Sequence, residues 1–486
     1  MPRQLEPEFV GRTYDDFLVR PRKGVVMSRE DIALTSRLTR DIEIELPVVA
    51  ANMDSVTGGT MAETMALEGG VGFVHRGQSI RGQVGQIQAV KRSHGFVVEE
   101  PITVPSDVPL REARDYAARH GTSLLVEERE GSGILAGLLT ARDIPWFEGW
   151  EDRPVSELMT PFDQLRTARP GIGLEEAERL LFENRVEKLP LVDEDRRIRG
   201  LITKQDVILH RHRPHVSKDA KGRLLVGAAI GATGDYLERA AELVAAGVDV
   251  VLIDIAHGHS EVMARAVEGF RRDFPDVPLV AGNVGTTDGA RFLADLGVDA
   301  IKVGIGPGRG CRTRLETAGG VPQLQAVREA WLAVGDEVPI IADGGVTQDK
   351  DIFLALVCGA STVMIGSGLS GTDEAPGHVI EDPASGQKLK IYRGMTSPQA
   401  VLETHYAAES DEVEEALATP PEGQEIQVPY KGSVVAILHR MRGHLRSSVS
   451  YAGTRTLADA RELIVPDPLR HLIPLSEAAY RESYER

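Results

Sequence analysis

Residues 223–256 read RLLVGAAIGATGDYLERAAELVAAGVDVVLIDIA, and this stretch sets the pattern for most of the chain. Two runs in it, 223–231 and 248–256, are apolar on both faces, as the buried strands of a parallel sheet must be. Between them lies DYLERAAELVAAG (235–247), whose apolar residues recur at helical spacing. A strand, a helix and a second strand in this order form one unit of an α/β protein.

The same strand pattern occurs at six other places, so the chain contains eight such runs. The six are 46–53, 71–75, 278–284, 299–306, 338–345 and 361–367. Eight parallel strand–helix units are typical of a TIM (β/α)8 barrel. A doubly wound open sheet is built from the same elements, and counting strands does not show whether the sheet closes. The sequence therefore predicts an α/β fold, with the barrel favoured over the open sheet.

Between residues 96 and 214 the barrel pattern stops and a weak repeat appears. Each copy contains a helix, a strand, a hairpin and a strand that ends in G-L-[LI]-T-x-x-D, which places Thr140 and Asp143 63 residues before Thr203 and Asp206. We therefore expect an inserted domain with two halves, about 100–152 and 153–212, in a barrel made of 1–95 and 215–486.

The repeat resembles a tandem pair of CBS motifs, a Bateman domain. This resemblance implies a regulatory role in which Thr140, Asp143, Thr203 and Asp206 bind ATP, GTP or both. In the alternative interpretation the two halves only pack against each other, because Thr-x-x-Asp also serves as an ordinary helix cap.

Composition excludes several classes of protein. The 486 residues contain 55 Lys and Arg against 73 Asp and Glu, a net charge of −18, and no basic stripe suited to a nucleic acid is present. The only two cysteines, Cys311 and Cys358, lack the spacing of a disulfide framework or a zinc site. Residues 1–16 contain no apolar signal run, and the longest uncharged stretch, 352–372, is rich in glycine, so we expect a cytoplasmic protein without membrane partners.

The segment 302–314, KVGIGPGRGCRTR, follows a predicted barrel strand, where the active sites of TIM barrels lie. Its alternating glycines allow the backbone to approach an ion or a ligand closely. Cys311 has three arginines around it, whose positive field favours the thiolate: Arg309, Arg312 and Arg314. We interpret Cys311 as a nucleophile, with a buried structural thiol as the alternative. Cys358 lies in the apolar stretch 353–360, where a structural role is favoured.

The same loop, followed by G-G-V-P-Q (319–323), resembles the catalytic loop of the IMP dehydrogenase and GMP reductase family. Further segments resemble the family in the same order: 14–21, 50–57, 254–260, 281–286, 342–346, 392–397 and 422–432. The resemblance covers essentially the whole chain. It implies a TIM barrel that acts at C2 of a purine nucleotide, GMP or IMP, through a covalent cysteine adduct, with a nicotinamide cofactor and assembly into a homotetramer or homo-octamer.

The resemblance also implies roles for individual residues. Cys311 would form the adduct, with Thr313 and Glu422 as the catalytic pair that moves protons. The residues implied for the substrate are Asn52, Met53, Arg309, Asp343, Gly344, Gly345, Gly366, Ser367, Tyr392, Gly394 and Met395. Those implied for the cofactor are Asp254, His257 and Asn283. The carbonyls of Gly306, Gly308 and Cys311 are candidates for a monovalent cation such as K+. Arg309 replaces the usual serine and Arg312 the usual threonine of the family.

The two branches of the family differ in a flap that precedes the E-G pair at Glu422. Dehydrogenases have an Arg-Tyr pair fourteen residues before that glutamate, where this chain has Ala408 and Glu409, and no arginine occurs in 403–423. We therefore predict an NADPH-dependent GMP reductase that forms IMP and ammonia. The alternatives are an IMP dehydrogenase that oxidises IMP to XMP with NAD, using His257 or Arg312 as the base, and a catalytically silent nucleotide sensor. The segment A-H-G-H-S (256–260) is closer to the dehydrogenase version.

Overall fold

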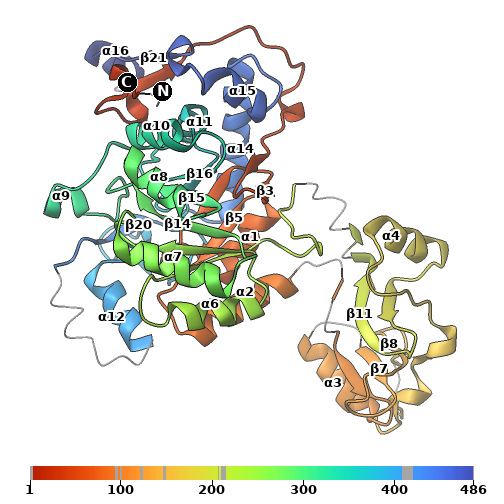
Figure 1. Ribbon diagram of the computed structural model, residues 1–486. Coiled ribbons are helices and arrows are strands. Elements are labelled where there is room, and N and C mark those ends of the chain that lie inside the picture. Colours follow the sequence, from red (N-terminus) through yellow and green to blue (C-terminus); the bar gives the residue numbers. More distant parts are fainter. Residues whose placement is uncertain are drawn as a thin grey trace. The chain divides into compact units, whose positions relative to one another are not determined.

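The computed structural model describes residues 4–93, 97–98, 101–120, 124–145, 149–205, 207–208, 215–407 and 420–484. The chain divides into two compact units (Figure 1). The first consists of Met1–Lys91 and His215–Arg486, and the second is Arg92–Pro214, the part that contains the repeat.

The first unit contains a closed parallel barrel with the strand order β12-β13-β14-β15-β16-β17-β4-β5. Its strands are β4 (Val48–Ala50), β5 (Val71–Val74), β12 (Gly227–Ile230), β13 (Val250–Asp254), β14 (Leu279–Val284), β15 (Ala300–Val303), β16 (Ile340–Asp343) and β17 (Thr362–Ile365). The sheet closes because β17 pairs with β4 and β12 pairs with β5. The predicted TIM barrel is thus confirmed, and the open doubly wound sheet is wrong.

Two apolar layers hold the barrel together. Alternate strand residues, such as Val250 and Leu252, form a core inside it, while Val251 and Ile253 belong to the larger core under the helices. Figure 1 shows α6, α7 and α8 covering the outside of their strands. The barrel helices are α1 (Gly59–Leu67), α2 (Ile80–Arg92), α6 (Tyr236–Ala245), α7 (Glu261–Asp273), α8 (Thr287–Asp295), α10 (Gln323–Val334) and α11 (Asp349–Cys358).

Segments outside the regular barrel complete its two ends. They include a three-stranded sheet of β18 (Ile380–Glu381), β19 (Lys388–Arg393) and β20 (Glu425–Pro429), and the pairs β1 (Phe17–Val19) with β21 (Leu472–Pro474) and β2 (Ser36–Arg37) with β3 (Glu43–Ile44). The additional helices are α9 (Thr313–Thr317), α12 (Pro398–Ala407), α14 (Val434–Tyr451), α15 (Leu457–Ile464) and α16 (Glu477–Tyr484).

The second unit has the same helix and antiparallel strand pair in each half. The first half contains α3 (Leu110–His120), β6 (Thr103–Pro105), β7 (Leu124–Glu127) and β8 (Leu135–Leu139), and the second contains β9 (Thr160–Pro161), α4 (Leu174–Glu183), β10 (Lys188–Val192) and β11 (Ile198–Thr203). β9 pairs with β8, so the sheet of the first half includes one strand of the second. Leu125 and Leu138 of the first half share an apolar core with Val192 and Leu201 of the second. The repeat is therefore one domain built of two packed halves.

The residues predicted to bind regulatory nucleotides lie at the ends of these strand pairs. Thr140 follows β8, and its backbone N–H and its hydroxyl donate to Asp143 Oδ2 at 2.7 and 2.8 Å. Thr203 ends β11, and Asp206 lies outside the described residues. Thr140 and Asp143 thus form a local turn that fits either interpretation of the repeat, and the nucleotide role stays a prediction.

A buried ion pair fastens the N-terminal segment to the barrel, and it gives a stability prediction. Arg328 of α10 is 1% exposed, pairs with Glu6, and donates to the Val465 carbonyl at 2.7 Å. Glu6→Ala would leave the guanidinium buried without its carboxylate, so we expect a loss of about 3 kcal/mol in the free energy of unfolding. Urea denaturation measures it, with Asp273→Ala, which breaks the exposed Arg272–Asp273 pair, as the control expected to cost much less. Equal losses in both variants would contradict the prediction.

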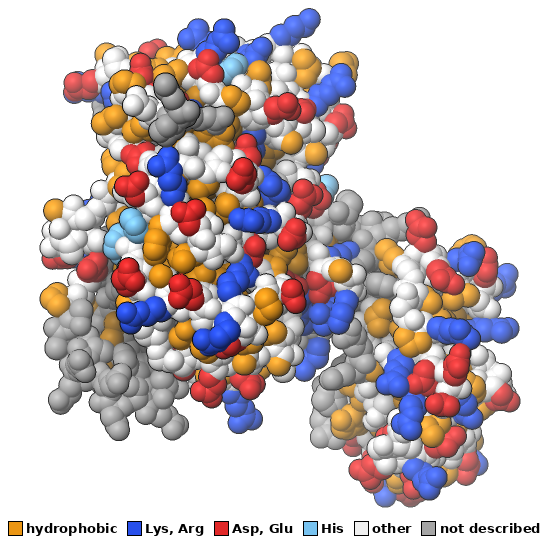
Figure 2. Space-filling view, viewed as in Figure 1, with side chains coloured by type: hydrophobic (Ala, Val, Ile, Leu, Met, Phe, Trp, Pro, Cys, Tyr) orange, Lys and Arg blue, Asp and Glu red, His pale blue; other side chains and the backbone are white. Residues whose placement is uncertain are grey.

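Acidic and basic side chains are interspersed over the face of the molecule in Figure 2. Among the described residues, no helix combines the length and apolar character needed to cross a membrane.

Candidate active site

The alternation of strand residues brings charged groups to the mouth of the barrel. The inner core contains Leu252 of β13, Ala300 of β15 and Ile341 of β16. Two residues further along each strand, and therefore also facing inward, come Asp254, Lys302 and Asp343. These are the C-terminal ends of the strands, where TIM barrels carry their active sites.

Lys302 joins the two aspartates. Its Nζ lies 2.8 Å from Asp254 Oδ1 and 2.7 Å from Asp343 Oδ2. Two amides complete the network: Asn52 Nδ2 donates to Asp254 Oδ2, and Asn283 Nδ2 donates to Asp343 Oδ2, both at 2.8 Å. The sequence prediction named the aspartates and the asparagines but missed Lys302, although its position at a strand end, facing inward, was a usable signal.

Burial by itself would lower the pKa of the Lys302 ammonium, but the two aspartates outweigh it and raise this pKa above its ordinary value. Burial likewise would raise the pKa of Asp254, and Lys302 and Asn52 more than offset it, so this pKa is lowered. Lys302 and Asp254 are therefore both charged at neutral pH.

The catalytic loop contains a chain of hydrogen bonds that begins at the cysteine. The Cys311 thiol donates to Thr313 Oγ1 at 3.1 Å, and the Thr313 hydroxyl donates to Glu422 Oε2 at 2.6 Å. Backbone bonds hold the two segments together: the N–H of Arg312 donates to the Glu422 carbonyl at 2.7 Å, and that of Gln424 to Gly310 at 3.0 Å. The three predicted catalytic residues are thus in contact, and they form a path along which a proton can move between sulfur and carboxylate.

Close backbone approach and backbone conformation explain three predicted glycines. A Cβ atom on Gly394 would lie 2.5 Å from the Gly310 carbonyl oxygen, so neither loop leaves room for a side chain there. Gly344 and Gly345 have φ angles of +87° and +78°, in the region that favours glycine. The loop after β16 therefore turns sharply beside Asp343.

Several predicted substrate residues meet at one wall of the site. The Tyr392 hydroxyl donates to Met53 Sδ at 3.7 Å, and a Cβ on Gly366 would lie 3.0 Å from the Tyr392 oxygen. Burial, and next the charge of Asp343, raise the pKa of Tyr392, so its hydroxyl remains a hydrogen-bond donor.

An ion pair that the sequence prediction missed fixes the loops of this wall. The carboxylate of Asp54 accepts from Arg393 Nε at 2.8 Å, and the Asp54 N–H donates to Met395 Sδ at 3.4 Å. The loop after β4 and the loop after β19 are thereby held together, which places Met53 and Met395 on the same side of the mouth.

Lys431 is a second cation that the sequence prediction missed. Its Nζ donates to the carbonyls of Ser367 and Gly368 at 2.8 and 3.0 Å. The family resemblance implies that the backbone at Gly366 and Ser367 holds the 5'-phosphate of the substrate. Burial, and next the charges of the nearby Arg309 and Arg440, lower the pKa of Lys431 to about 8.

This position leads to a pH prediction. A bound phosphate favours the protonated amine, so nucleotide affinity should be highest below about pH 8 and fall as the pH rises through that value and Lys431 loses its charge. We expect the KM for the nucleotide to rise about tenfold from pH 7 to pH 9, the size of one charged hydrogen bond. Lys431→Gln should show the high KM at both pH values, while Lys388→Gln, at an exposed lysine, should behave as the parent. A parent KM that stays constant over this range would contradict the prediction.

The remaining predicted residues have the following positions. Arg312 Nε donates to Glu316 Oε1 at 2.7 Å, a partner that the sequence prediction did not name. The sequence also offers the acidic segment 409–415 as a partner for Arg312, and that segment lies outside the described residues. His257 is exposed on the loop after β13, and Asn283 also donates to the Gly304 carbonyl at 2.8 Å. The Gly308 carbonyl accepts the Cys311 N–H at 3.0 Å, so one of the three carbonyls suggested for a cation is already engaged. Cys358 is buried, which raises its pKa to about 12, as suits a structural thiol.

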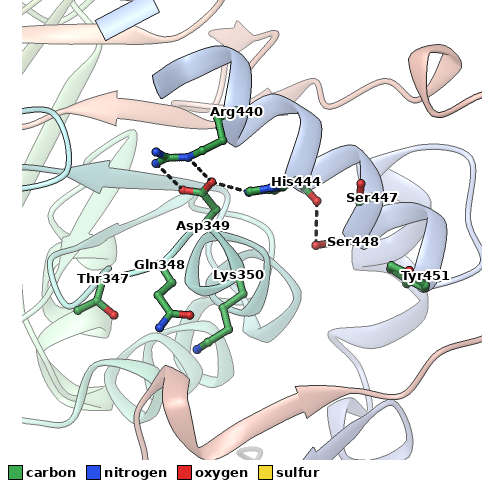
Figure 3. A pocket seen from close by; sticks show the side chains of 9 residues that line it. All are labelled: Thr347, Gln348, Asp349, Lys350, Arg440, His444, Ser447, Ser448 and Tyr451. Carbon is green, nitrogen blue, oxygen red and sulfur yellow. Dashed lines mark hydrogen bonds and ion pairs between the residues drawn. The ribbon is translucent and has the colours of Figure 1, made fainter. Parts of the chain in front are cut away.

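A cavity of about 490 Å³ lies where the loop that joins β16 to α11 enters the helix (Figure 3). Asp349, the first residue of α11, accepts from Arg440 Nε at 2.9 Å and contacts His444 Nδ1 at 2.6 Å, both on α14. The residues that line the cavity are Thr347, Gln348, Asp349, Lys350, Arg440, His444, Ser447, Ser448 and Tyr451. These contacts fasten α14 to the loop that contains Gly344 and Gly345.

Comparison with known proteins shows the family of the chain. The family model "IMP dehydrogenase / GMP reductase domain" matches residues 11–485. Inosine-5'-monophosphate dehydrogenase of Nitrosopumilus maritimus is 42% identical over 97% of both chains, and that of Aquifex aeolicus is 40% identical over 98% of this chain and 95% of the relative.

Solved structures of GMP reductase from Trypanosoma brucei are also similar. A cysteine-to-alanine variant in complex with guanosine 5'-monophosphate has a TM-score of 0.88 and 37% identity, covering 98% of this chain and 97% of that one. A complex of that enzyme with guanosine 5'-triphosphate has a TM-score of 0.78 and 34% identity, covering 96% and 98%. With its closed barrel, its cysteine loop and these matches, the chain belongs to the IMP dehydrogenase/GMP reductase family of oxidoreductases.

Proposed function

We propose that the protein is a GMP reductase, which converts GMP, NADPH and two protons to IMP, ammonium and NADP+. The observation that carries this choice is the absence of any arginine from 403–423, where dehydrogenases have the Arg-Tyr pair that activates water. Without that pair the water that would hydrolyse the adduct lacks the base that the family resemblance implies, whereas Thr313 and Glu422, the pair implied for proton transfer to the departing amine, are both present.

The relay of Cys311, Thr313 and Glu422 supports the deamination. The Cys311 sulfur would attack C2 of GMP, and its proton would pass through the Thr313 hydroxyl to Glu422, over the 3.1 and 2.6 Å contacts. The same path would return a proton to the departing amino group, which leaves as ammonia while the C2–S bond remains. A hydride delivered to C2 then allows the C2–S bond to break, which yields IMP and restores the thiolate.

The mouth of the barrel suits the ribose groups of two nucleotides. Asp343 and Asp254 are each partly exposed, with side chains 21% and 20% accessible, and a carboxylate there can accept from a pair of ribose hydroxyls. We assign Asp343 to the substrate and Asp254, with His257, to the cofactor. NADPH would supply the hydride at this site.

The second unit is proposed to bind ATP or GTP and to regulate the barrel, at Thr140, Asp143, Thr203 and Asp206. The repeat pattern supports this role, and a solved structure of the similar Trypanosoma brucei enzyme contains guanosine 5'-triphosphate. We further propose a cytoplasmic homotetramer or homo-octamer, as the family resemblance implies.

IMP dehydrogenase is the second candidate, favoured by the names of the curated relatives and by the A-H-G-H-S segment at 256–260. It would need another base. Arg312 is paired with Glu316, whereas His257 is exposed on the loop after β13, so His257 is the better placed of the two.

The two functions are separated by nicotinamide absorbance in two parallel reactions, GMP with NADPH and IMP with NAD. The proposal predicts loss of reduced cofactor in the first and no gain in the second. A gain of reduced cofactor in the second reaction alone would establish the dehydrogenase instead, and His257→Ala would then be the first variant to test.

A further inference from the structure

Lys302 is the most deeply buried charged group at the mouth of the barrel. It is 3% exposed, while the side chains of the two aspartates it contacts are 20% and 21% exposed. The lysine is therefore more deeply buried than the two carboxylates that it bridges.

The fold makes room for this side chain. Gly282 of β14 is the register partner of both Asp254 on β13 and Lys302 on β15. A Cβ atom on Gly282 would lie 2.6 Å from the Lys302 Cβ. Because that position is glycine, the lysine can extend across β14 and reach Asp254 two strands away.

We propose that Lys302 is a positioning residue that holds the substrate-ribose carboxylate and the cofactor-ribose carboxylate ionised and in place, and so couples the two binding sites. This inference rests on the assignment of Asp343 and Asp254 made above. One ammonium bonded to both carboxylates offsets their mutual repulsion. Lys302 and Asn283 both donate to the same oxygen of Asp343, Oδ2, and among the described residues no group donates to Oδ1. That oxygen is left for a ribose hydroxyl.

Removal of the cation leaves two neighbouring carboxylates in a buried position, where one would gain a proton or turn away. Lys302→Met should therefore weaken the binding of both GMP and NADPH. Each Kd should rise by about tenfold to hundredfold, equivalent to about 1.4–2.8 kcal/mol. Lys302→Arg keeps the charge and should recover part of the loss. A lysine that only tied strands together would change the thermal midpoint without this joint loss.

The chain offers a matched control at the opposite end of the same strand. Lys91 is 5% exposed and pairs with Asp249 Oδ2 at 2.6 Å and Asp219 Oδ2 at 3.0 Å, and Asp249 directly precedes β13. Lys91→Met breaks an equally buried lysine between two aspartates, away from the mouth. It should reduce stability without changing either Kd.

The experiment measures the Kd values of GMP, IMP and NADPH by equilibrium dialysis, with thermal unfolding beside them, for the full-length parent, Lys302→Met, Lys302→Arg and Lys91→Met. A double variant, Lys302→Met with Asp343→Asn, completes a cycle: once Asp343 is neutral, the lysine change should add little to the loss of GMP affinity.

Two results would overturn the inference: Kd values of Lys302→Met within twofold of the parent, or the same weakening in Lys91→Met. Because GMP and IMP share the ribose 5'-phosphate, these measurements remain valid if the enzyme oxidises IMP. Failure of the proposed reaction and failure of the role of Lys302 are thus distinguishable.

Discussion

Cys311→Ala should reduce turnover by at least about 10⁴-fold while GMP still binds. The sulfur is the atom that would bond to C2, and no side chain next to it in the relay is a comparable nucleophile: Thr313 and Glu422 donate and accept protons. The rate of NADPH oxidation and the Kd of GMP by equilibrium dialysis measure the two effects.

Cys358→Ala is the matched control, because Cys358 is fully buried in α11 with a pKa raised to about 12. Its turnover should stay within a few-fold of the parent. Substantial turnover in Cys311→Ala would remove the covalent mechanism, whichever reaction the enzyme performs.

Glu422→Gln should slow ammonia release by about 10²- to 10⁴-fold, the usual contribution of a general acid or base. The Thr313 hydroxyl donates to Glu422 at 2.6 Å, so the neutral amide removes the group that takes and returns the proton. Hydride transfer alone can be followed as the single-turnover burst of NADPH from IMP and NADP+, a step that needs no ammonia. That burst should be slowed less than ammonia release, because it uses the relay only to remove the cysteine proton.

Thr313→Val breaks the same relay at its middle member and serves as the companion variant. It should reproduce the defect of Glu422→Gln, and the double variant should be little worse than either one, since the residues act as a unit. Equal slowing of the burst and of ammonia release would contradict the proton-transfer role.

The barrel could be predicted from the sequence because each strand is an apolar run with a helical pattern after it. The closure of the barrel could not be predicted, since it depends on the pairing of β17 with β4 and of β5 with β12. The long insertion separates β5 from β12 in the sequence. Local patterns do not record such pairings.

The contact of Cys311, Thr313 and Glu422 could be expected, because the first two are two residues apart and the resemblance supplied Glu422. Lys302 and Lys431 were missed because a lysine in a strand or loop is usually a surface residue. The roles of these two lysines depend on partners such as Asp254 and Ser367, which are distant in sequence.

The most direct test of the proposed reaction uses GMP labelled with ¹⁵N in its amino group. The purified enzyme is mixed with this substrate and NADPH, and the amounts of labelled ammonium, IMP and oxidised NADPH are measured. The account predicts one labelled ammonium and one IMP for every NADPH oxidised. No labelled ammonium, together with XMP formed from IMP and NAD, would contradict it.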